Sequence, residues 1–263
     1  MAINSDNSLD ANHVCYLAGT GGGKTAAVKL LELWGDCVAI FDMYGDYKYD
    51  GRKKQSPFNG LGGRAVYHYS TRNTFARAFV DAWRSGKKFV VAYQPEFNAN
   101  LQGKELKAAK QNELYWFGQL VWAAADGNRQ LDVVIEELAK LASTSGKDDT
   151  IIGELATGGR KFGVVLHSIF QRSQEVPKTI WNNSPRKVLG AQESKGDAKA
   201  ISEELDVPVE QVFQLSILNN KFKKKRLYYL VKTSGGIGNI TPFMIEIKTG
   251  KKQKTEIQVN LTA

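Results

Sequence analysis

The chain has 263 residues, of which 42% are hydrophobic and 24% charged, a globular composition that excludes wholesale disorder. Its two cysteines, Cys15 and Cys37, exclude a disulfide scaffold, and no cysteine–histidine cluster has zinc spacing. Lysine and arginine number 36 against 27 aspartates and glutamates, so the net charge is +9. This surplus fits a nucleic acid partner, an anionic membrane, or a basic protein that is merely soluble.

The first 12 residues form a polar leader without the basic and apolar regions of a signal peptide. Apolar runs are short, and none approaches the roughly 20 residues of a membrane span. We therefore expect a soluble intracellular protein.

Apolar segments alternate with helical patterns along most of the chain. Strands are predicted at 13–17, 37–41, 65–69, 89–93, 131–135, 162–169 and 187–190, and helices at 25–34, 74–84, 104–126, 151–159 and 197–205. This alternation predicts an α/β fold with a mostly parallel sheet and helices on both faces. The alternating segments 227–231 and 243–247 predict an antiparallel hairpin. We expect one domain, 13–263, with a core at 13–205 and a C-terminal β appendage at 206–263.

The sequence AGTGGGKT at 18–25 is a phosphate-binding loop, because a strand precedes it and a helix follows it. Its glycines allow backbone N–H groups to surround phosphate oxygens at the start of a helix. Lys24 is expected to reach the β- and γ-phosphates and Thr25 to bind Mg²⁺. The predicted ATP-binding residues are Gly19, Thr20, Gly21, Gly22, Gly23, Lys24 and Thr25.

Two adjacent acids, Glu136 and Glu137, end the apolar strand at 131–135. Strand alternation points them in different directions, so we expect different roles. Glu136 is predicted to bind Mg²⁺ through a coordinated water, and Glu137 to orient and deprotonate the attacking water. A second acid is what hydrolysis needs, which favours an ATPase over a kinase that excludes water.

The segment 159–172 contains a basic pair, a buried strand and then Gln171. An amide at this strand tip can bond to the γ-phosphate or to the attacking water and so report whether the nucleotide is intact. Arg160 lies at the other end of the strand, away from the phosphates of its own subunit. It is either an arginine finger for a neighbouring subunit or a cation at a helix C-terminus.

These motifs together resemble the FtsK–HerA superfamily of P-loop ATPases, most closely the genome-packaging ATPases of tailless, membrane-containing viruses. The resemblance covers residues 13–205 and rests on AGTGGGKT at 18–25, FDMYGDY at 41–47, VVIEE at 133–137 and the segment 159–183. The sequence departs from the family pattern at Ala18, where Gly is usual, at Glu136, where Asp is usual, and after Asp42, where proline often follows. The role of Asp42 is left open.

The resemblance implies a P-loop NTPase fold of the RecA-like type and a homo-oligomeric ring, commonly a hexamer, that drives double-stranded DNA through its centre. It also implies ATP and Mg²⁺ as cofactors, with Lys24, Thr25, Glu136, Glu137, Gln171 and Arg160 in the roles above. The expected setting is the virion or the host cytoplasm, with capsid-vertex or membrane-protein partners. Packaging of a viral genome into a preformed capsid is the favoured function.

Other interpretations stay open at this point. One is a kinase or small-molecule NTPase indifferent to DNA; another is a nucleotide-gated assembly factor in which Glu137 is dispensable. The lysine-rich segment 221–226, with Lys248, Lys251, Lys252 and Lys254, is either a solvated face or a DNA-phosphate contact. Loops 94–104 and 143–149 are alternative DNA contacts, whereas Tyr228, Tyr229 and Trp181 are expected in the core or at its rim.

Overall fold

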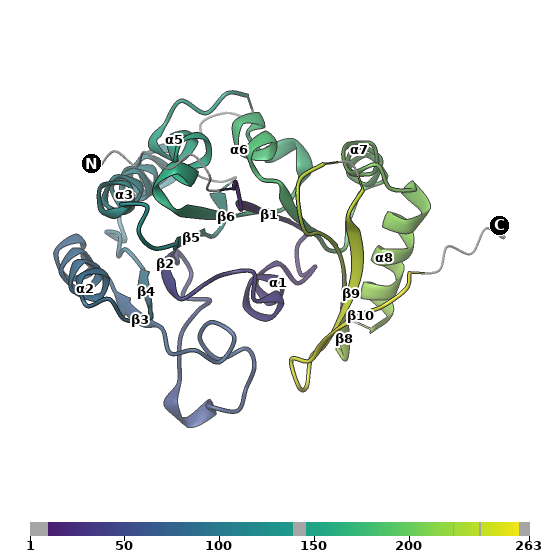
Figure 1. Ribbon diagram of the computed structural model, residues 1–263, viewed down its shortest axis with the longest axis horizontal. Coiled ribbons are helices and arrows are strands. Elements are labelled where there is room, and N and C mark those ends of the chain that lie inside the picture. The colour runs from purple at the N-terminus through teal and green to yellow at the C-terminus, as the bar shows by residue number, and fades with distance from the viewer. Residues whose placement is uncertain (1–9, 139–145, 223, 237, 258–263) are drawn as a thin grey trace.

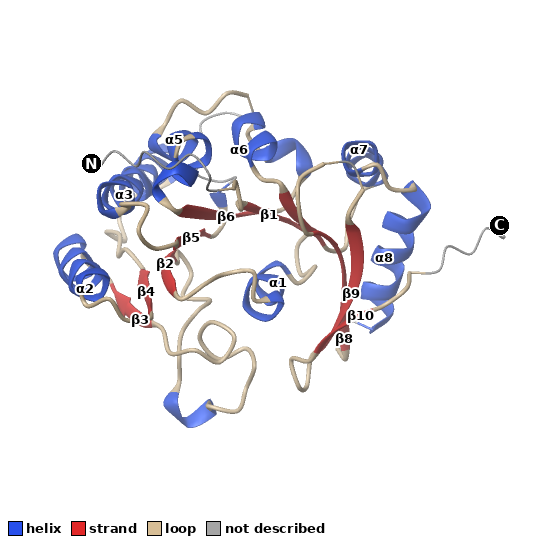
Figure 2. Ribbon diagram, in the orientation of Figure 1, coloured by secondary structure: helices blue, strands red, loops and turns tan. Residues whose placement is uncertain are grey.

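One continuous sheet of 10 strands organises the computed structural model, which describes residues 10–138, 146–222, 224–236 and 238–257 (Figures 1 and 2). The strand order is β10-β9-β8-β7-β1-β6-β5-β2-β4-β3. Strands β7 to β3 in this order are parallel to one another, and β8, β9 and β10 pair in antiparallel fashion. The predicted mostly parallel α/β fold is therefore confirmed.

The strands are β1 (Val14–Leu17), β2 (Cys37–Phe41), β3 (Tyr67–Tyr69), β4 (Phe89–Tyr93), β5 (Leu131–Ile135), β6 (Val164–Phe170), β7 (Arg186–Leu189), β8 (Arg226–Lys232), β9 (Ile240–Glu246) and β10 (Lys252–Lys254). The α-helices are α1 (Lys24–Leu31), α2 (Arg72–Arg84), α3 (Gly103–Ala124), α5 (Ile151–Thr157), α6 (Lys178–Asn183), α7 (Lys195–Leu205) and α8 (Val209–Phe222). Short 3-10 helices are η1 (Gly51–Lys53), η2 (Gly159–Phe162) and η3 (Ser173–Glu175).

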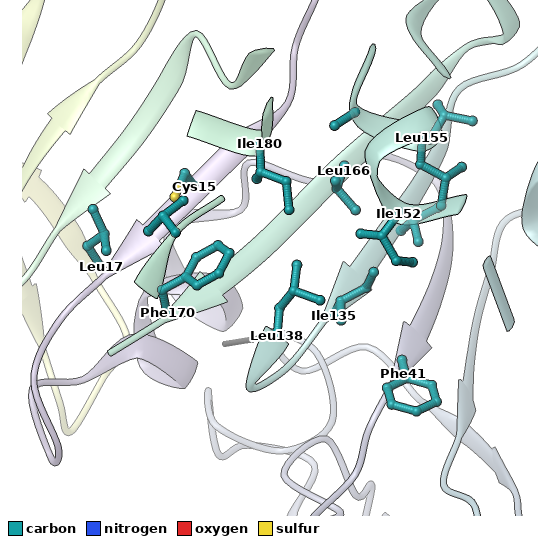
Figure 3. Packing of buried hydrophobic residues seen from close by; sticks show 14 of the residues in the cluster. Cys15, Leu17, Phe41, Ile135, Leu138, Ile152, Leu155, Leu166, Phe170 and Ile180 are labelled. Carbon is teal, nitrogen blue, oxygen red and sulfur yellow. The ribbon is translucent and has the colours of Figure 1, made fainter. Parts of the chain in front are cut away.

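The two faces of the sheet are covered differently. Side chains of α2, α3, α5, α6, α7 and α8 form the larger apolar cluster with one face, part of which is drawn in Figure 3. On the other face, α1 packs with the connection between β2 and β3, which contributes Tyr47, Leu61 and Val66. Strands β1, β2, β4, β5 and β6 are buried along their whole length, as expected for parallel strands covered on both sides.

Local sequence explains the helix boundaries. The Thr71 hydroxyl caps α2 by accepting a bond from the Thr74 N–H, and Phe75, Phe79 and Trp83 recur every four residues on its buried face. Helix α1 ends three residues earlier than predicted, at Leu31, because Glu32 adopts a left-handed conformation with φ of 52°. Strand β6 likewise begins only after Gly163, whose φ is 74°.

The C-terminal part contains more structure than the sequence predicted. Helices α6 and α8 were not predicted, because amide and hydroxyl side chains interrupt their apolar patterns. The expected hairpin is present as β8 and β9, and β7 pairs with β8 so that it extends the main sheet. The buried Asn219 amide of α8 donates to the Tyr228 carbonyl at 2.8 Å and accepts its N–H at 2.9 Å, which joins this helix to β8.

Some predictions fall on residues outside the described ranges. These are most of the polar leader, Lys223 of the basic segment, and residues 143–145 of one proposed DNA-contacting loop. Among the described residues, no helix combines the length and apolarity needed to cross a lipid bilayer. Both cysteines are buried and free, as their apolar strands predicted.

Candidate active site

The phosphate-binding loop connects β1 to α1 at the carboxyl edge of the parallel strands. Gly21 and Gly23 have φ values of 71° and 85°, a conformation that glycine adopts without strain. The Gly19 N–H donates to the Ala191 carbonyl at 2.8 Å, so the loop after β7 holds the loop's first turn. Lys24 donates to the carbonyl oxygens of Ala18 and Gly19 at 3.0 and 3.3 Å, which places its ammonium over the loop.

Ala18 in place of the usual glycine is accommodated by glycines opposite it. A Cβ built on Gly22 or Gly190 would lie 2.9 or 2.8 Å from the Ala18 methyl group. Both neighbours therefore have to be glycine when position 18 carries a side chain.

The C-terminal strand β8 also supports this loop. The Tyr229 hydroxyl donates to the Gly23 carbonyl at 2.8 Å, and a Cβ on Gly23 would lie 2.6 Å from that hydroxyl oxygen. Tyr229 is 1% exposed and Tyr228 8%, so both belong to the core as expected. Tyr229 thus fixes the start of α1, a role that the sequence did not indicate.

A hollow of about 320 Å³ opens beside the loop. Its walls are the phosphate-binding loop, the segment after β7, the end of α8 and the start of β8. The lining residues are Gly19, Thr20, Gly21, Gly22, Ala191, Gln192, Glu193, Asn219, Asn220 and Leu227. A nucleotide whose phosphates occupied the loop would have this space for its remaining atoms.

The two acids after β5 take different positions, as strand alternation predicted. Glu136 is 2% exposed and accepts a hydrogen bond from the Tyr47 hydroxyl at 2.5 Å. The pKa of Glu136 is raised from 4.5 to about 7, chiefly by burial; the hydrogen bond from Tyr47 opposes this rise, and the nearby carboxylates of Asp46, Asp42 and Glu137 add to it. This carboxyl group therefore lies behind the site, against Tyr47.

Glu137 lies in the left-handed region with φ of 55°, which is uncommon for a residue with a side chain. Such backbone strain is concentrated at functional sites. Its two carboxylate oxygens accept bonds from the Gln171 amide nitrogen at 2.9 and 3.2 Å.

Gln171, directly after β6, joins both halves of the site. Its amide nitrogen donates to Glu137, and its oxygen accepts the Thr20 hydroxyl of the phosphate-binding loop at 3.3 Å. The structure therefore brings Thr20, Gln171 and Glu137 into one hydrogen-bonded series. Arg160 is not part of it: η2 places Arg160 before β6, at the opposite edge of the sheet.

Asp42, whose role the sequence left open, organises the segment after β2. Its buried carboxylate accepts the N–H groups of Asp46 and Tyr47 at 2.8 and 3.1 Å and contacts the His68 ring nitrogen at 2.9 Å. These bonds shape the turn that directs Tyr47 toward Glu136. The four- and five-residue spacing within FDMYGDY is the only sequence signal for this turn, since Asp side chains commonly bond to nearby backbone groups.

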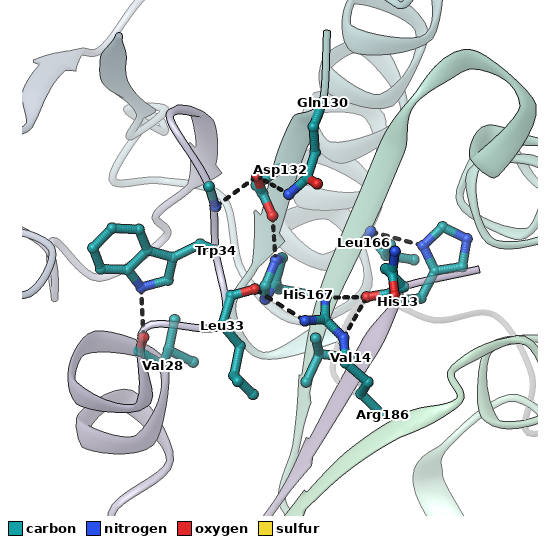
Figure 4. Close-up of polar contacts among 12 residues, drawn as sticks. His13, Val14, Val28, Leu33, Trp34, Gln130, Asp132, Leu166, His167 and Arg186 are labelled. Atoms are coloured by element: carbon teal, nitrogen blue, oxygen red, sulfur yellow. Dashed lines mark hydrogen bonds and ion pairs between the residues drawn. The ribbon is translucent and has the colours of Figure 1, made fainter. Parts of the chain in front are cut away.

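A buried hydrogen-bond series connects the three strands that carry the site, and Figure 4 shows its Asp132–His167 contact. Asp132 of β5 contacts the His167 ring of β6 at 2.8 Å, and the other His167 ring nitrogen lies 3.1 Å from the Tyr16 hydroxyl of β1. The second oxygen of Asp132 accepts the Gly35 N–H at 2.9 Å. Because both acid and ring are fully buried, these partners satisfy groups that would otherwise be costly.

No protein-family model matches this chain. Over 116 residues, or 44% of the chain, it is 34% identical to Protein P9 of Pseudoalteromonas phage PM2. The match covers 51% of that protein, so the chain spans about half the length of the curated relative it matches.

Two solved structures share the fold over nearly the whole chain. The genome-packaging NTPase B204 of Sulfolobus turreted icosahedral virus 2, solved with sulfate, is 11% identical with a TM-score of 0.51, covering 93% of this chain and 96% of B204. VirB4 of Thermoanaerobacter pseudethanolicus is 13% identical with a TM-score of 0.54, covering 99% of this chain and 93% of VirB4. The predicted P-loop NTPase fold is therefore confirmed.

Replacing Glu136 by Gln is expected to stabilise the fold by about 1–3 kcal/mol more at pH 8 than at pH 5. Because its pKa is raised from 4.5 to about 7, the folded chain keeps a proton that the unfolded chain has lost. Stability from this group is thus complete below pH 4.5 and is lost as the pH rises to about 7. The pKa of buried His13 is lowered from 6.5 to about 4, so this group adds stability as the pH rises. Because the wild type and the variant share this contribution, it cancels when their stabilities are compared.

Urea unfolding at both pH values, without nucleotide or Mg²⁺, measures this difference. The exposed Glu203 provides a matched Glu203→Gln control at the surface of α7. An equal effect of Glu136→Gln at pH 5 and pH 8 would contradict the raised pKa.

Proposed function

We propose that this chain is an ATP-hydrolysing motor that moves double-stranded DNA and packages a viral genome into a preformed capsid. The observation that carries the proposal is the hydrogen-bonded series Thr20–Gln171–Glu137, which connects a phosphate-binding loop to a carboxylate. A loop that only binds nucleotide has no need of that carboxylate. Hydrolysis does, because water must be oriented and deprotonated.

In the proposed reaction, water attacks the γ-phosphate of ATP in line with the leaving oxygen. Glu137 accepts the proton of that water, and Gln171 holds the Glu137 carboxylate and senses the phosphate. Lys24 exchanges the carbonyl oxygens of Ala18 and Gly19 for phosphate oxygens and neutralises their charge. Backbone N–H groups from Gly19 to Gly23 hold the phosphates.

Mg²⁺ is the expected metal, and the residues present fit it in part. Among the described residues, no group of three or more His, Cys, Asp or Glu side chains could hold a metal ion. An ion here would therefore depend on the Thr25 hydroxyl and on the nucleotide's own oxygens, with Glu136 acting through water from behind the site. When bound, Mg²⁺ would supply neutralisation of phosphate charge.

Two observations support DNA as the partner. The net charge is +9, and B204, which shares the fold, is described as a genome-packaging NTPase. We infer a virion-associated or cytoplasmic protein with capsid-vertex or membrane-protein partners.

We further propose that the chain is one domain, residues 13–263, that works in a ring. The continuous sheet and the Tyr229–Gly23 contact support the single domain. The position of Arg160, at the edge away from its own phosphate-binding loop, fits an arginine finger that completes the site of a neighbouring subunit, in a hexamer by family resemblance.

Long double-stranded DNA is expected to stimulate steady-state ATP hydrolysis at low salt. Replacing Glu137 by Gln should lower both basal and stimulated rates by about 10²–10⁴-fold, because the acceptor of the water proton is lost. Glu203→Gln, a change at an exposed acid of α7, is the matched control and should retain DNA stimulation. Hydrolysis that is lost in Glu137→Gln but indifferent to DNA would favour a DNA-independent NTPase.

Mixing two inactive variants tests whether Arg160 acts as an arginine finger in the site of a neighbouring subunit. Glu137→Gln subunits and Arg160→Ala subunits are each expected to be nearly inactive, since a finger is worth about 10³–10⁵ in rate. In mixed rings some interfaces pair an intact Glu137 with an intact Arg160, so hydrolysis should reappear and be maximal near equal proportions. No recovery at any ratio would exclude Arg160 from the neighbouring site.

A further inference from the structure

Three lysines lie on one side of the first half of α3. Lys104, Lys107 and Lys110 recur every third residue, so at about 100° per residue they span an arc of about 120°. Glu105 lies outside this arc, about 100° from Lys104 in the other direction. We call these three residues the α3 lysine row.

Two members of the α3 lysine row, Lys107 and Lys110, border the same hollow as Glu137. This hollow has a volume of about 210 Å³. Its lining residues are Met43, Tyr44, Gly103, Leu106, Lys107, Lys110 and Glu137. The row therefore lies next to the carboxylate proposed to activate water, on a side of the site that the phosphate-binding loop does not occupy.

Aromatic rings, not carboxylates, are the contacts that the structure gives the row. The Lys110 ammonium lies 5.8 Å from the centre of the Tyr44 ring and 6.0 Å from that of Phe97, and Tyr44 is 50% exposed. Within the described ranges, no carboxylate forms an ion pair with any of the three lysines. In the part of the chain that the structure describes, their charge is thus not neutralised by an ion pair.

A general need for solubility does not explain this distribution. All lysines of α3 lie in its first half, and the stretch Gln111–Ala124 of this 22-residue helix contains neither lysine nor arginine. The cations are concentrated at the end of the helix that borders the Glu137 hollow. Such a concentration fits an anionic partner held at that place.

We propose that the α3 lysine row contacts the phosphates of double-stranded DNA, so that the duplex is held beside Glu137. Lys104 to Lys110 span about 9 Å of helix axis, and three base pairs of DNA span about 10 Å. Lysine ammonium groups act as point charges and contact phosphates without reading sequence. The inference rests on the proposed function and adds to it the surface through which DNA stimulates hydrolysis.

The test compares two triple variants of equal charge. Lys104→Ala/Lys107→Ala/Lys110→Ala removes the row, and Arg84→Ala/Lys87→Ala/Lys88→Ala removes three exposed cations near the start of β4, at the opposite edge of the sheet. Binding to a long duplex is measured from 50 to 200 mM salt, together with ATP hydrolysis with and without DNA. Because Lys107 and Lys110 border the hollow that Glu137 lines, DNA stimulation is expressed relative to each variant's own basal rate of hydrolysis.

We expect the row variant to lower the slope of log affinity against log salt by about 2–3 and to reduce DNA stimulation at least tenfold. The control variant should keep the wild-type slope and stimulation. Replacing the three lysines by arginine should restore both, which separates loss of charge from loss of folding.

A row variant that keeps the wild-type slope and stimulation, or a control variant that loses as much, would overturn the assignment while leaving the motor intact. Wild-type protein that neither binds the duplex nor responds to it would overturn the proposed function itself. The two failures are therefore distinguishable.

Discussion

The site depends on the hydrogen bonds that the side chain of Gln171 forms. Its carboxamide bonds on one side to Thr20 of the phosphate-binding loop and on the other to Glu137. This is feasible because β6 lies between β1 and β5, with Leu17 in register with Phe170 and Ile135 with Ser168. Three parallel strands thus end at one edge and deliver a phosphate cradle, an amide and a carboxylate within hydrogen-bond reach.

Groups behind this edge hold it in place. The buried series Tyr16–His167–Asp132 joins the same three strands. The Tyr47 hydroxyl donates a hydrogen bond to the carboxyl group of Glu136 and so supports the residue that follows β5. Removing one partner of such a buried hydrogen bond commonly costs about 1–3 kcal/mol, so these residues restrict how the strands can shift. The C-terminal strand β8 adds Tyr229 against Gly23, so the last part of the chain is linked to the nucleotide site.

The sequence was sufficient where a residue's role depends on its own strand or loop. AGTGGGKT lies between a strand and a helix, and the different directions of Glu136 and Glu137 follow from strand alternation. It was insufficient where a role depends on a partner distant in the chain. Neither the Gln171–Glu137 contact nor the Tyr47–Glu136 contact has a local pattern, because 34 and 89 residues separate the partners.

The sequence pattern also did not predict the exact ends of helices and strands, or the helices rich in polar residues. Helix α8 carries amides along its length, and its Asn219 is buried because the Tyr228 backbone satisfies it, which no periodicity of apolar residues reveals. The roles of Lys24, Thr25, Glu136, Glu137, Gln171 and Arg160 stay predictions that solution experiments have to test. The arrangement of these residues supports one central claim, that Gln171 couples the nucleotide to Glu137.

Replacement of Gln171 by Ala tests this claim most directly, through parallel measurement of ATP affinity and steady-state hydrolysis. We predict an affinity within about threefold of wild type, because the loop itself is intact, and a turnover about 10²-fold lower, because Glu137 is no longer held. Gln174→Ala, in the neighbouring η3, is the matched control and should leave both quantities unchanged. Wild-type turnover in Gln171→Ala, or a loss explained entirely by weaker ATP binding, would contradict the account.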